Sequence, residues 1–216
     1  MATGNGDGAP RGGGKPARCV VFDVGRVLID WQPAAFFAAR IPDAARHRFF
    51  MEEVVPMEWH QEQDRGRSLA EGVRLRQQAY PAHAADIAAF YDNWLDTIPG
   101  SMPGMDHLLA DLNAHDVPCH AITNFSAELW PLTVAAHPIL SWLDEVVVSG
   151  EEGLLKPDPE IFALLLERIS RPAADCVFVD DLAANVDAAA ALGFDAILFS
   201  GADDLRRDLA RRGLLG

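Results

Sequence analysis

The residues best suited to chemistry are polar side chains that follow apolar runs along the chain. They are Asp23, Thr123 with Asn124, Lys156, and Asp180 with Asp181. Taken singly they are ordinary, since Thr-Asn is typical of turns, Lys-Pro of exposed loops and paired aspartates of helix starts. Their shared position is informative, because polar residues that follow parallel strands meet in one crevice at the carboxyl edge of the sheet. Three carboxylates gathered there would repel one another unless a cation lay among them.

The apolar runs have the length and composition of buried strands. Strands are predicted over residues 18–22, 117–123, 145–149, 176–179 and 196–199. Helical spacing separates them, over residues 105–114, 127–136, 159–169, 183–192 and 203–212. A polar loop is expected at residues 150–153, and Asp158 is expected to cap the helix that begins at Pro159. Strands that alternate with helices predict an α/β fold, a doubly wound parallel sheet covered on both faces.

The chain between the first two strands has a different character. Residues 32–97 carry amphipathic helical stretches separated by prolines and polar turns, with no comparable strand signal. We therefore predict a small all-helical cap domain at 32–97, inserted into a core domain formed by residues 17–31 and 98–216. Residues 1–16 are rich in glycine and lack periodicity, so a disordered leader is expected there.

Composition and charge narrow the range of partners. The formal net charge is -14, which argues against nucleic acid, because proteins that bind it present basic surfaces to the phosphates. No apolar run approaches the roughly 20 residues needed to cross a bilayer, so no membrane partner is expected. Cys19, Cys119 and Cys176 are far apart and each begins an apolar run, which is typical of buried, reduced thiols in a cytoplasmic protein. Nothing in the sequence specifies an oligomeric state.

Four segments, in this order, resemble the motifs of the haloacid dehalogenase superfamily of hydrolases. They are FDVGRV at residues 22–27, AITN at 121–124, LKPDPEIF at 155–162 and VFVDDLAANVDAA at 177–189. The resemblance extends over residues 19–199 and implies a Rossmann-like core. The order and spacing suit the phosphatase branch, in which a small helical cap is inserted after the first strand.

The resemblance implies a phosphohydrolase that acts on a small phosphorylated metabolite, such as a sugar phosphate, with Mg²⁺ as cofactor. Asp23 would attack phosphorus to give an aspartyl-phosphate that water then hydrolyses. Lys156 would neutralise charge on the transferring group and on Asp23.

The same resemblance implies which groups hold the metal and the phosphate. The metal ligands would be Asp23, the backbone carbonyl of Gly25 and Asp181, with Asp180 supporting them from behind. The hydroxyl of Thr123 and the backbone amide of Asn124 would hold phosphate oxygens.

One position departs from the family pattern. Most phosphatases of the superfamily carry a second aspartate two residues after the nucleophile, as general acid and base, and that position is Gly25 here. Loss of such a group removes roughly 10²–10⁴-fold in rate. Three outcomes stay open: a substrate whose leaving group needs little protonation, a proton from a cap residue or a water, or a chain without activity.

The predicted cap offers few groups that could supply the proton. Its candidates are Glu58, His60, Glu62 and Asp64. Histidine titrates near neutrality, although a surface or packing role is the common one for a single histidine. Four aromatic residues are expected in the core or, less commonly, in the wall of a substrate pocket: Trp59, Trp94, Phe125 and Trp130.

Two other functions fit part of the pattern. A 2-haloacid dehalogenase displaces halide with the same aspartate and without a metal, and such relatives also lack the second aspartate. The pair Asp180 and Asp181 argues against this function, because dehalogenases carry neutral residues there. A catalytically weak binding or regulatory protein is the other alternative, suggested by Gly25, and the presence of nucleophile, lysine and acidic pair together argues against it.

Overall fold

A five-stranded parallel sheet with the strand order β3-β2-β1-β4-β5 forms the centre of the molecule. The computed structural model describes residues 18–216, so the leader predicted at residues 1–16 lies outside the described residues. The strands are β1 (Cys19–Phe22), β2 (Cys119–Thr123), β3 (Glu145–Val148), β4 (Cys176–Asp180) and β5 (Asp195–Leu198). In the register of β1, Val21 faces His120 of β2 and Phe178 of β4. The predicted α/β parallel sheet is therefore confirmed.

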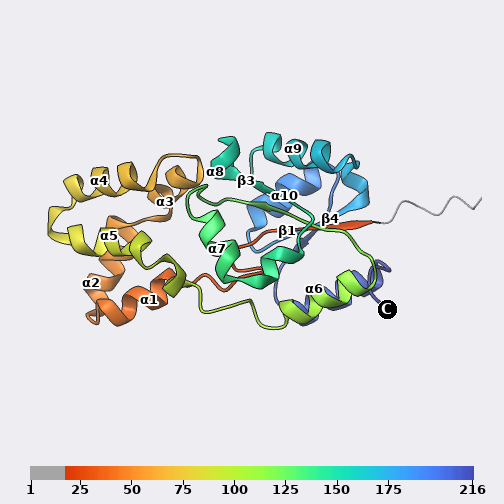
Figure 1. Ribbon diagram of the computed structural model, residues 1–216, viewed down its shortest axis with the longest axis horizontal. Helices are drawn as coiled ribbons and strands as arrows, with labels where there is room; N and C mark the ends of the chain where they lie inside the picture. Colours follow the sequence, from red (N-terminus) through yellow and green to blue (C-terminus); the bar gives the residue numbers. More distant parts are fainter. Residues whose placement is uncertain (1–17) are drawn as a thin grey trace, which may run out of the picture.

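Helices cover both faces of this sheet (Figure 1). The side chains of β1 alternate between two apolar clusters, since Val20 and Phe22 face one side and Cys19 and Val21 the other. The first cluster includes α6 (Met105–Ala114) and α11 (Ala202–Arg211), and the second includes α9 (Pro159–Ile169) and α10 (Ala183–Ala191). A strand buried on both faces needs the continuous apolar run seen in the sequence.

Residues 33–97 form a helical insert between β1 and α6, to the left of the sheet in Figure 1. Its elements are α1 (Pro33–Arg40), α2 (Ala44–Phe49), a π-helical turn (Phe50–Val54), α3 (Met57–Asp64), α4 (Leu69–Ala79), α5 (Ala84–Asp92) and two 3-10 turns (Pro81–His83 and Trp94–Thr97). Phe37 packs against Phe50 and Phe90 at ring-centroid distances of 4.8 and 5.8 Å. The helical character of 32–97 is as predicted, and its independence as a domain stays a prediction.

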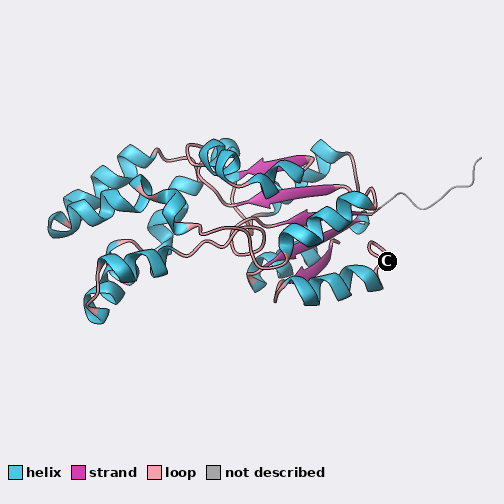
Figure 2. Ribbon diagram, turned by 60° about the horizontal axis from the view of Figure 1, so that its bottom comes forward, coloured by secondary structure: helices cyan, strands magenta, loops and turns pink. Residues whose placement is uncertain are grey.

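The carboxyl ends of the strands face this insert (Figure 2). A buried hydroxyl joins the two parts: Ser149 donates to the backbone carbonyl of Asp64 at 2.6 Å and accepts from the Phe125 N–H at 2.8 Å. Gly150 follows, and a Cβ there would lie 2.5 Å from the backbone nitrogen of Ala127. Only glycine allows these segments to approach so closely. The Ser149 hydroxyl thus ties the insert to the carboxyl edge of the sheet.

Three local predictions were wrong. The polar loop expected at 150–153 is a helical turn, α8 (Ser149–Glu152), closed by Gly153 at a φ of 71°. The helix expected from residue 127 begins later, as α7 (Trp130–Ala136), and is followed by a 3-10 turn (Pro138–Trp142). The helix start at Pro159 is correct, but the side chain of Asp158 makes no capping hydrogen bond. Its carboxylate lies instead 3.9 Å from Arg65 of the insert.

Another short 3-10 turn (Ala173–Asp175) precedes β4. Between residues 18 and 216, no helix is both long enough and apolar enough to cross a bilayer. A cytoplasmic location stays a prediction.

Candidate active site

Lys156 lies between two carboxylates at the carboxyl edge of the sheet. Its ammonium nitrogen is 2.7 Å from Asp23 Oδ1 and 2.7 Å from Asp180 Oδ2, and its side chain is 1% exposed. Asp23 follows β1, and its backbone N–H donates to the carbonyl of Val179 in β4 at 2.8 Å. That bond fixes the ends of the two strands side by side. Three of the residues predicted from the sequence therefore meet.

The two carboxylate oxygens of Asp23 have different environments. Oδ1 accepts from the backbone N–H of Val24 at 2.7 Å and contacts Lys156. Oδ2 makes no hydrogen bond to any residue of the described chain, and Asp23 lines a cavity. One oxygen is tethered and the other is open, so the carboxylate is oriented and still has a free lone pair to offer.

Asp180 and Asp181 differ in burial and therefore in the groups they can contact. The Asp180 carboxylate is fully buried and accepts from Lys156, from the Leu182 N–H at 2.9 Å and from Asn185 Nδ2 at 3.0 Å. Asp181 is half-buried and lines the cavity. This supports the prediction that Asp181 is the direct metal ligand and that Asp180 orients its neighbours.

The electrostatic balance at this edge is negative. Desolvation raises the pKa of Asp23 to about 7, against the opposing effect of Lys156. Desolvation and the charge of Asp180 also raise the pKa of Asp181, while Arg26 and Lys156 oppose this. Burial by itself would lower the pKa of Lys156, but Asp23 and Asp180 outweigh it and the pKa lies above its ordinary value. Three carboxylates thus face one buried ammonium.

A divalent cation fits this donor set. One carboxylate oxygen each from Asp23, Asp180 and Asp181 lies within 4.8 Å of the others. Hard carboxylate oxygens are the ligands that Mg²⁺ prefers. Burial is the main cause of the raised pKa values of Asp23 and Asp181, and the neighbouring carboxylates raise them further, a repulsion that a cation would offset. The predicted backbone ligand, Gly25, lines the same cavity.

Asn124 has a structural task that the sequence did not indicate. Its side-chain Oδ1 accepts from the Lys156 N–H at 2.8 Å, and its Nδ2 donates to the Lys156 carbonyl at 2.9 Å. This pair of bonds fixes the loop that carries Lys156. Asn124 also lines the cavity, whereas Thr123, the last residue of β2, is 1% exposed and lies outside the cavity wall.

The cavity has a volume of about 240 Å³ and lies between the sheet edge and the insert. Its floor holds the polar residues described above. Most of the apolar wall consists of Trp31, Met57, Trp94, Phe125 and Leu182. Trp94 and Phe125 are buried as well as lining the cavity. Trp59 is buried in the apolar core and Trp130 is half-buried against it, and neither lines the cavity.

The four candidate proton donors of the insert separate by helix face. His60 and Asp64, one helical turn apart on α3, are 5% and 3% exposed and line the cavity. Glu58 and Glu62 are exposed and do not line it. His60 Nδ1 lies 3.0 Å from the Tyr91 hydroxyl, and Nε2 lies 3.7 Å from Asp64 Oδ2. His60 is therefore not a surface residue, and its ring stacks on Trp31 and Trp94, in agreement with the packing role considered for it.

Several wall residues were not predicted as site residues, notably Arg26, Trp31, Met57 and Asn185. Asn185 had a usable signal, since it lies one helical turn beyond Asp181 and reaches back to Asp180. The others lie in the loop after β1 or at the start of α3, and their side-chain directions depend on the packing of the insert. Periodicity does not encode such packing.

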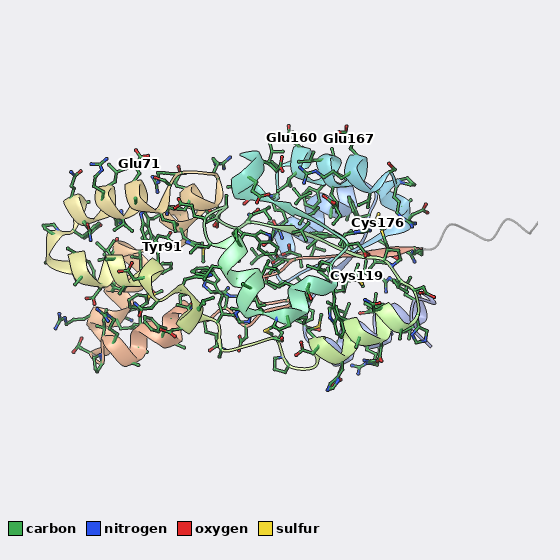
Figure 3. The ribbon with its side chains drawn as sticks, in the orientation of Figure 1. Glu71, Tyr91, Cys119, Glu160, Glu167 and Cys176 are labelled. Carbon is green, nitrogen blue, oxygen red and sulfur yellow. The ribbon has the colours of Figure 1, made fainter. Side chains whose placement is uncertain are left out.

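The cysteines lie away from this site. Cys19, Cys119 and Cys176 are the first residues of β1, β2 and β4, at the amino ends of the strands, and all are buried and free. Figure 3 shows Cys119 and Cys176 at the opposite end of the molecule from Tyr91 of the insert. The expected buried thiols are confirmed, and none of them reaches the cavity.

Comparison with known proteins gives several matches. The chain is 33% identical over 119 residues to flavin mononucleotide hydrolase 1 of Arabidopsis thaliana, a match that covers 52% of this chain and 46% of that protein. The chain thus spans less than half the length of that relative. It is 26% identical over 202 residues to the sesquiterpene phosphatase astK of Aspergillus oryzae, covering 92% of this chain and 97% of astK.

Solved structures agree on the fold. The magnesium complex of the HAD family enzyme bt-2542 from Bacteroides thetaiotaomicron superposes with a TM-score of 0.67 at 18% identity, over 90% of this chain and 99% of that one. The sequence model of the haloacid dehalogenase-like hydrolase family matches residues 17–193. This range includes Asp23, Lys156, Asp180 and Asp181. This chain belongs to the haloacid dehalogenase-like hydrolases.

Proposed function

We propose that this hydrolase is a Mg²⁺-dependent phosphohydrolase of a small phosphorylated metabolite, with Asp23 as the nucleophile. The observation that carries the proposal is the buried Lys156 between Asp23 and Asp180, beside the half-buried Asp181. A phosphate dianion needs this cationic support to approach a carboxylate. The names of two relatives, a flavin mononucleotide hydrolase and a sesquiterpene phosphatase, support phosphate ester chemistry.

In the proposed reaction, the free Oδ2 of Asp23 forms a bond to phosphorus as the bond to the leaving oxygen breaks. Water then attacks phosphorus of the aspartyl-phosphate, which releases phosphate and restores the carboxylate. Lys156 holds Oδ1 and so fixes the direction of attack. Mg²⁺ held by Asp23, Asp181 and the Gly25 carbonyl would supply positive charge that offsets repulsion between nucleophile and phosphate.

The site is a poor match to the dehalogenase alternative. A 2-haloacid carries its own carboxylate, which would have to enter beside Asp23 and Asp181 with the buried Lys156 already engaged by two carboxylates. Like charges at this separation are costly in a desolvated site.

Removal of the metal tests the proposal. With p-nitrophenyl phosphate, whose leaving group needs no protonation, we expect turnover in Mg²⁺, loss of turnover in EDTA and recovery when Mg²⁺ is added back. Phosphate release should be measured directly. Equal turnover in EDTA would contradict the metal requirement. No turnover in Mg²⁺ would contradict phosphohydrolysis, and halide release from 2-haloacids would be measured next.

Gly25→Asp is expected to raise turnover of alkyl phosphates by about 10²-fold, because it would restore a general acid beside the leaving group. The fold has room for it, since a Cβ at Gly25 meets nothing within 4 Å and the residue is not among those with positive φ. The kcat/KM on p-nitrophenyl phosphate should change little, because kcat/KM reports formation of the aspartyl-phosphate and this leaving group needs no acid. The kcat/KM values for both substrates check this.

Gly100→Asp is the matched control, because Gly100 is equally open and lies outside the cavity wall. An unchanged rate on alkyl phosphates in a Gly25→Asp variant that still hydrolyses p-nitrophenyl phosphate would show that the missing acid does not limit the reaction.

A further inference from the structure

Arg26 adopts a backbone conformation that is unfavourable for its residue type. Its φ is 60°, in the left-handed region, where glycine carries no penalty and a residue with a Cβ does. The loop imposes this conformation, since the Arg26 N–H donates to the Ile29 carbonyl at 2.7 Å. An unfavourable conformation of this kind beside a reaction centre suggests a function for the side chain.

The guanidinium of Arg26 is available for a ligand. Arg26 is exposed and lines the cavity, and its side chain makes no hydrogen bond or ion pair to residues 18–216. Its Cζ lies 5.6 Å from the centroid of the Trp31 ring, a contact that positions a cation without neutralising it. The indole thus holds the charge at the mouth of the cavity.

The other cation of the site, Lys156, already pairs with two carboxylates. Lys156 is buried and contacts Asp23 and Asp180 at 2.7 Å each, while Asp64 and Asp181 add two more carboxylates to the cavity wall. In a chain with a net charge of -14, the global field repels anions. Arg26 is the cation in the described cavity wall that makes no salt bridge, and its charge acts on Asp181, whose pKa it helps to lower.

We propose that Arg26 is a specificity residue that binds a second anionic group, on the organic part of the substrate. This rests on the proposed phosphohydrolase function. The substrate class is then a phosphomonoester whose organic part is apolar enough to pack against Trp31, Trp94 and Phe125 and carries a carboxylate or further phosphate. The guanidinium fork pairs with such groups through two parallel hydrogen bonds.

A matched pair of substrates tests this. Wild type and Arg26→Gly are compared on 4-carboxyphenyl phosphate and phenyl phosphate, which share the aromatic ring and differ in the second charge. The readout is the ratio of the two kcat/KM values. Comparing this ratio between proteins cancels the intrinsic reactivities of the substrates. We expect the ratio to fall about tenfold or more in Arg26→Gly, equivalent to about 1.4 kcal/mol.

Two further variants sharpen the test. Arg26→Lys keeps the charge without the fork and should give an intermediate ratio. Arg65→Gln removes an exposed charge from the insert, outside the cavity wall, and should keep the wild-type ratio. Thermal melting shows whether Arg26→Gly is folded, and its midpoint should at least equal that of wild type because glycine accepts the loop conformation.

The outcomes separate this inference from the function beneath it. An unchanged ratio in Arg26→Gly, or an equal loss on both substrates, would overturn the role of Arg26 while the phosphohydrolase stands. The equal loss would place Arg26 on the transferred phosphoryl group. Failure of wild type to hydrolyse both of these substrates and p-nitrophenyl phosphate in Mg²⁺ would overturn the proposed function and this inference together.

Discussion

Replacing Asp23 by asparagine is expected to lower hydrolysis of phosphomonoesters by at least about 10⁴-fold, the scale of loss when a nucleophile is removed. The amide has nearly the same shape but is a very poor nucleophile. Phosphate release from p-nitrophenyl phosphate in Mg²⁺ measures the effect. Folding should survive, because Asp23 is a buried carboxylate with a pKa raised to about 7, and a neutral side chain there avoids the cost of desolvating a charge.

Asp30→Asn is the matched control. Asp30 lies in the same loop, is half-buried and accepts a hydrogen bond from the Gln32 side chain, outside the cavity wall. It should keep wild-type turnover. If purified Asp23→Asn, free of contaminating wild-type enzyme, retained more than a few per cent of the wild-type activity, Asp23 would not be the nucleophile.

Lys156→Met should have the second large effect, on both stability and rate. The variant leaves Asp23 and Asp180 buried without their counter-charge, and loss of one partner from such a group costs about 3–5 kcal/mol of unfolding free energy. Turnover of the folded fraction should fall by about 10²–10³-fold, the scale for an electrostatic contact in the transition state. Denaturant unfolding and phosphate release measure the two effects.

The stability loss should depend on pH. The pKa of Asp23 in the folded protein lies above its unfolded value, so the penalty is small at low pH, where the carboxyl is protonated in both states, and grows as pH rises towards and beyond about 7. The free energy of unfolding of Lys156→Met should therefore fall further below that of wild type at a pH of about 8 than at about 5.

Two comparisons isolate the buried charge. Arg168→Met removes a surface cation that also has two carboxylate partners, Glu145 at 3.4 Å and Glu152 at 2.6 Å, and it should cost no more than about 1 kcal/mol. Combining Lys156→Met with Asp180→Asn should recover part of the stability and none of the activity. A Lys156→Met variant as stable as wild type at the higher pH would contradict the charge balance described for this site.

The convergence of Asp23, Lys156 and Asp180 was predictable because it follows from chain topology. Each polar group comes after a buried run, and a parallel sheet brings the carboxyl ends of its strands to one edge. The same reasoning could not assign atoms. The family resemblance gives Asn124 a backbone contact to phosphate, which stays a prediction, and the structure adds a role for its side chain, which binds the backbone of Lys156.

The wall of the cavity was less predictable, since it depends on how the insert docks. The helical repeat places His60 and Asp64 on one face of α3 and Glu58 and Glu62 on another. Which of these faces is buried depends on how the insert docks. Arg26 lies in the loop after β1. Its φ of 60° depends on the hydrogen bond that its backbone N–H donates to the Ile29 carbonyl. No local pattern in the sequence specifies that bond.

The proposed intermediate is a covalent phosphoryl group on Asp23, and chemical trapping tests for it most directly. Because Gly25 supplies no base to activate water, the aspartyl-phosphate should accumulate during turnover of p-nitrophenyl phosphate in Mg²⁺. Acid quenching followed by borohydride reduction converts an acyl phosphate to an alcohol, and peptide mass spectrometry locates the reduced residue. We predict reduction at position 23 that depends on substrate and on Mg²⁺. Phosphate release with residue 23 unreduced, or with the reduction at Asp180 or Asp181, would contradict the account.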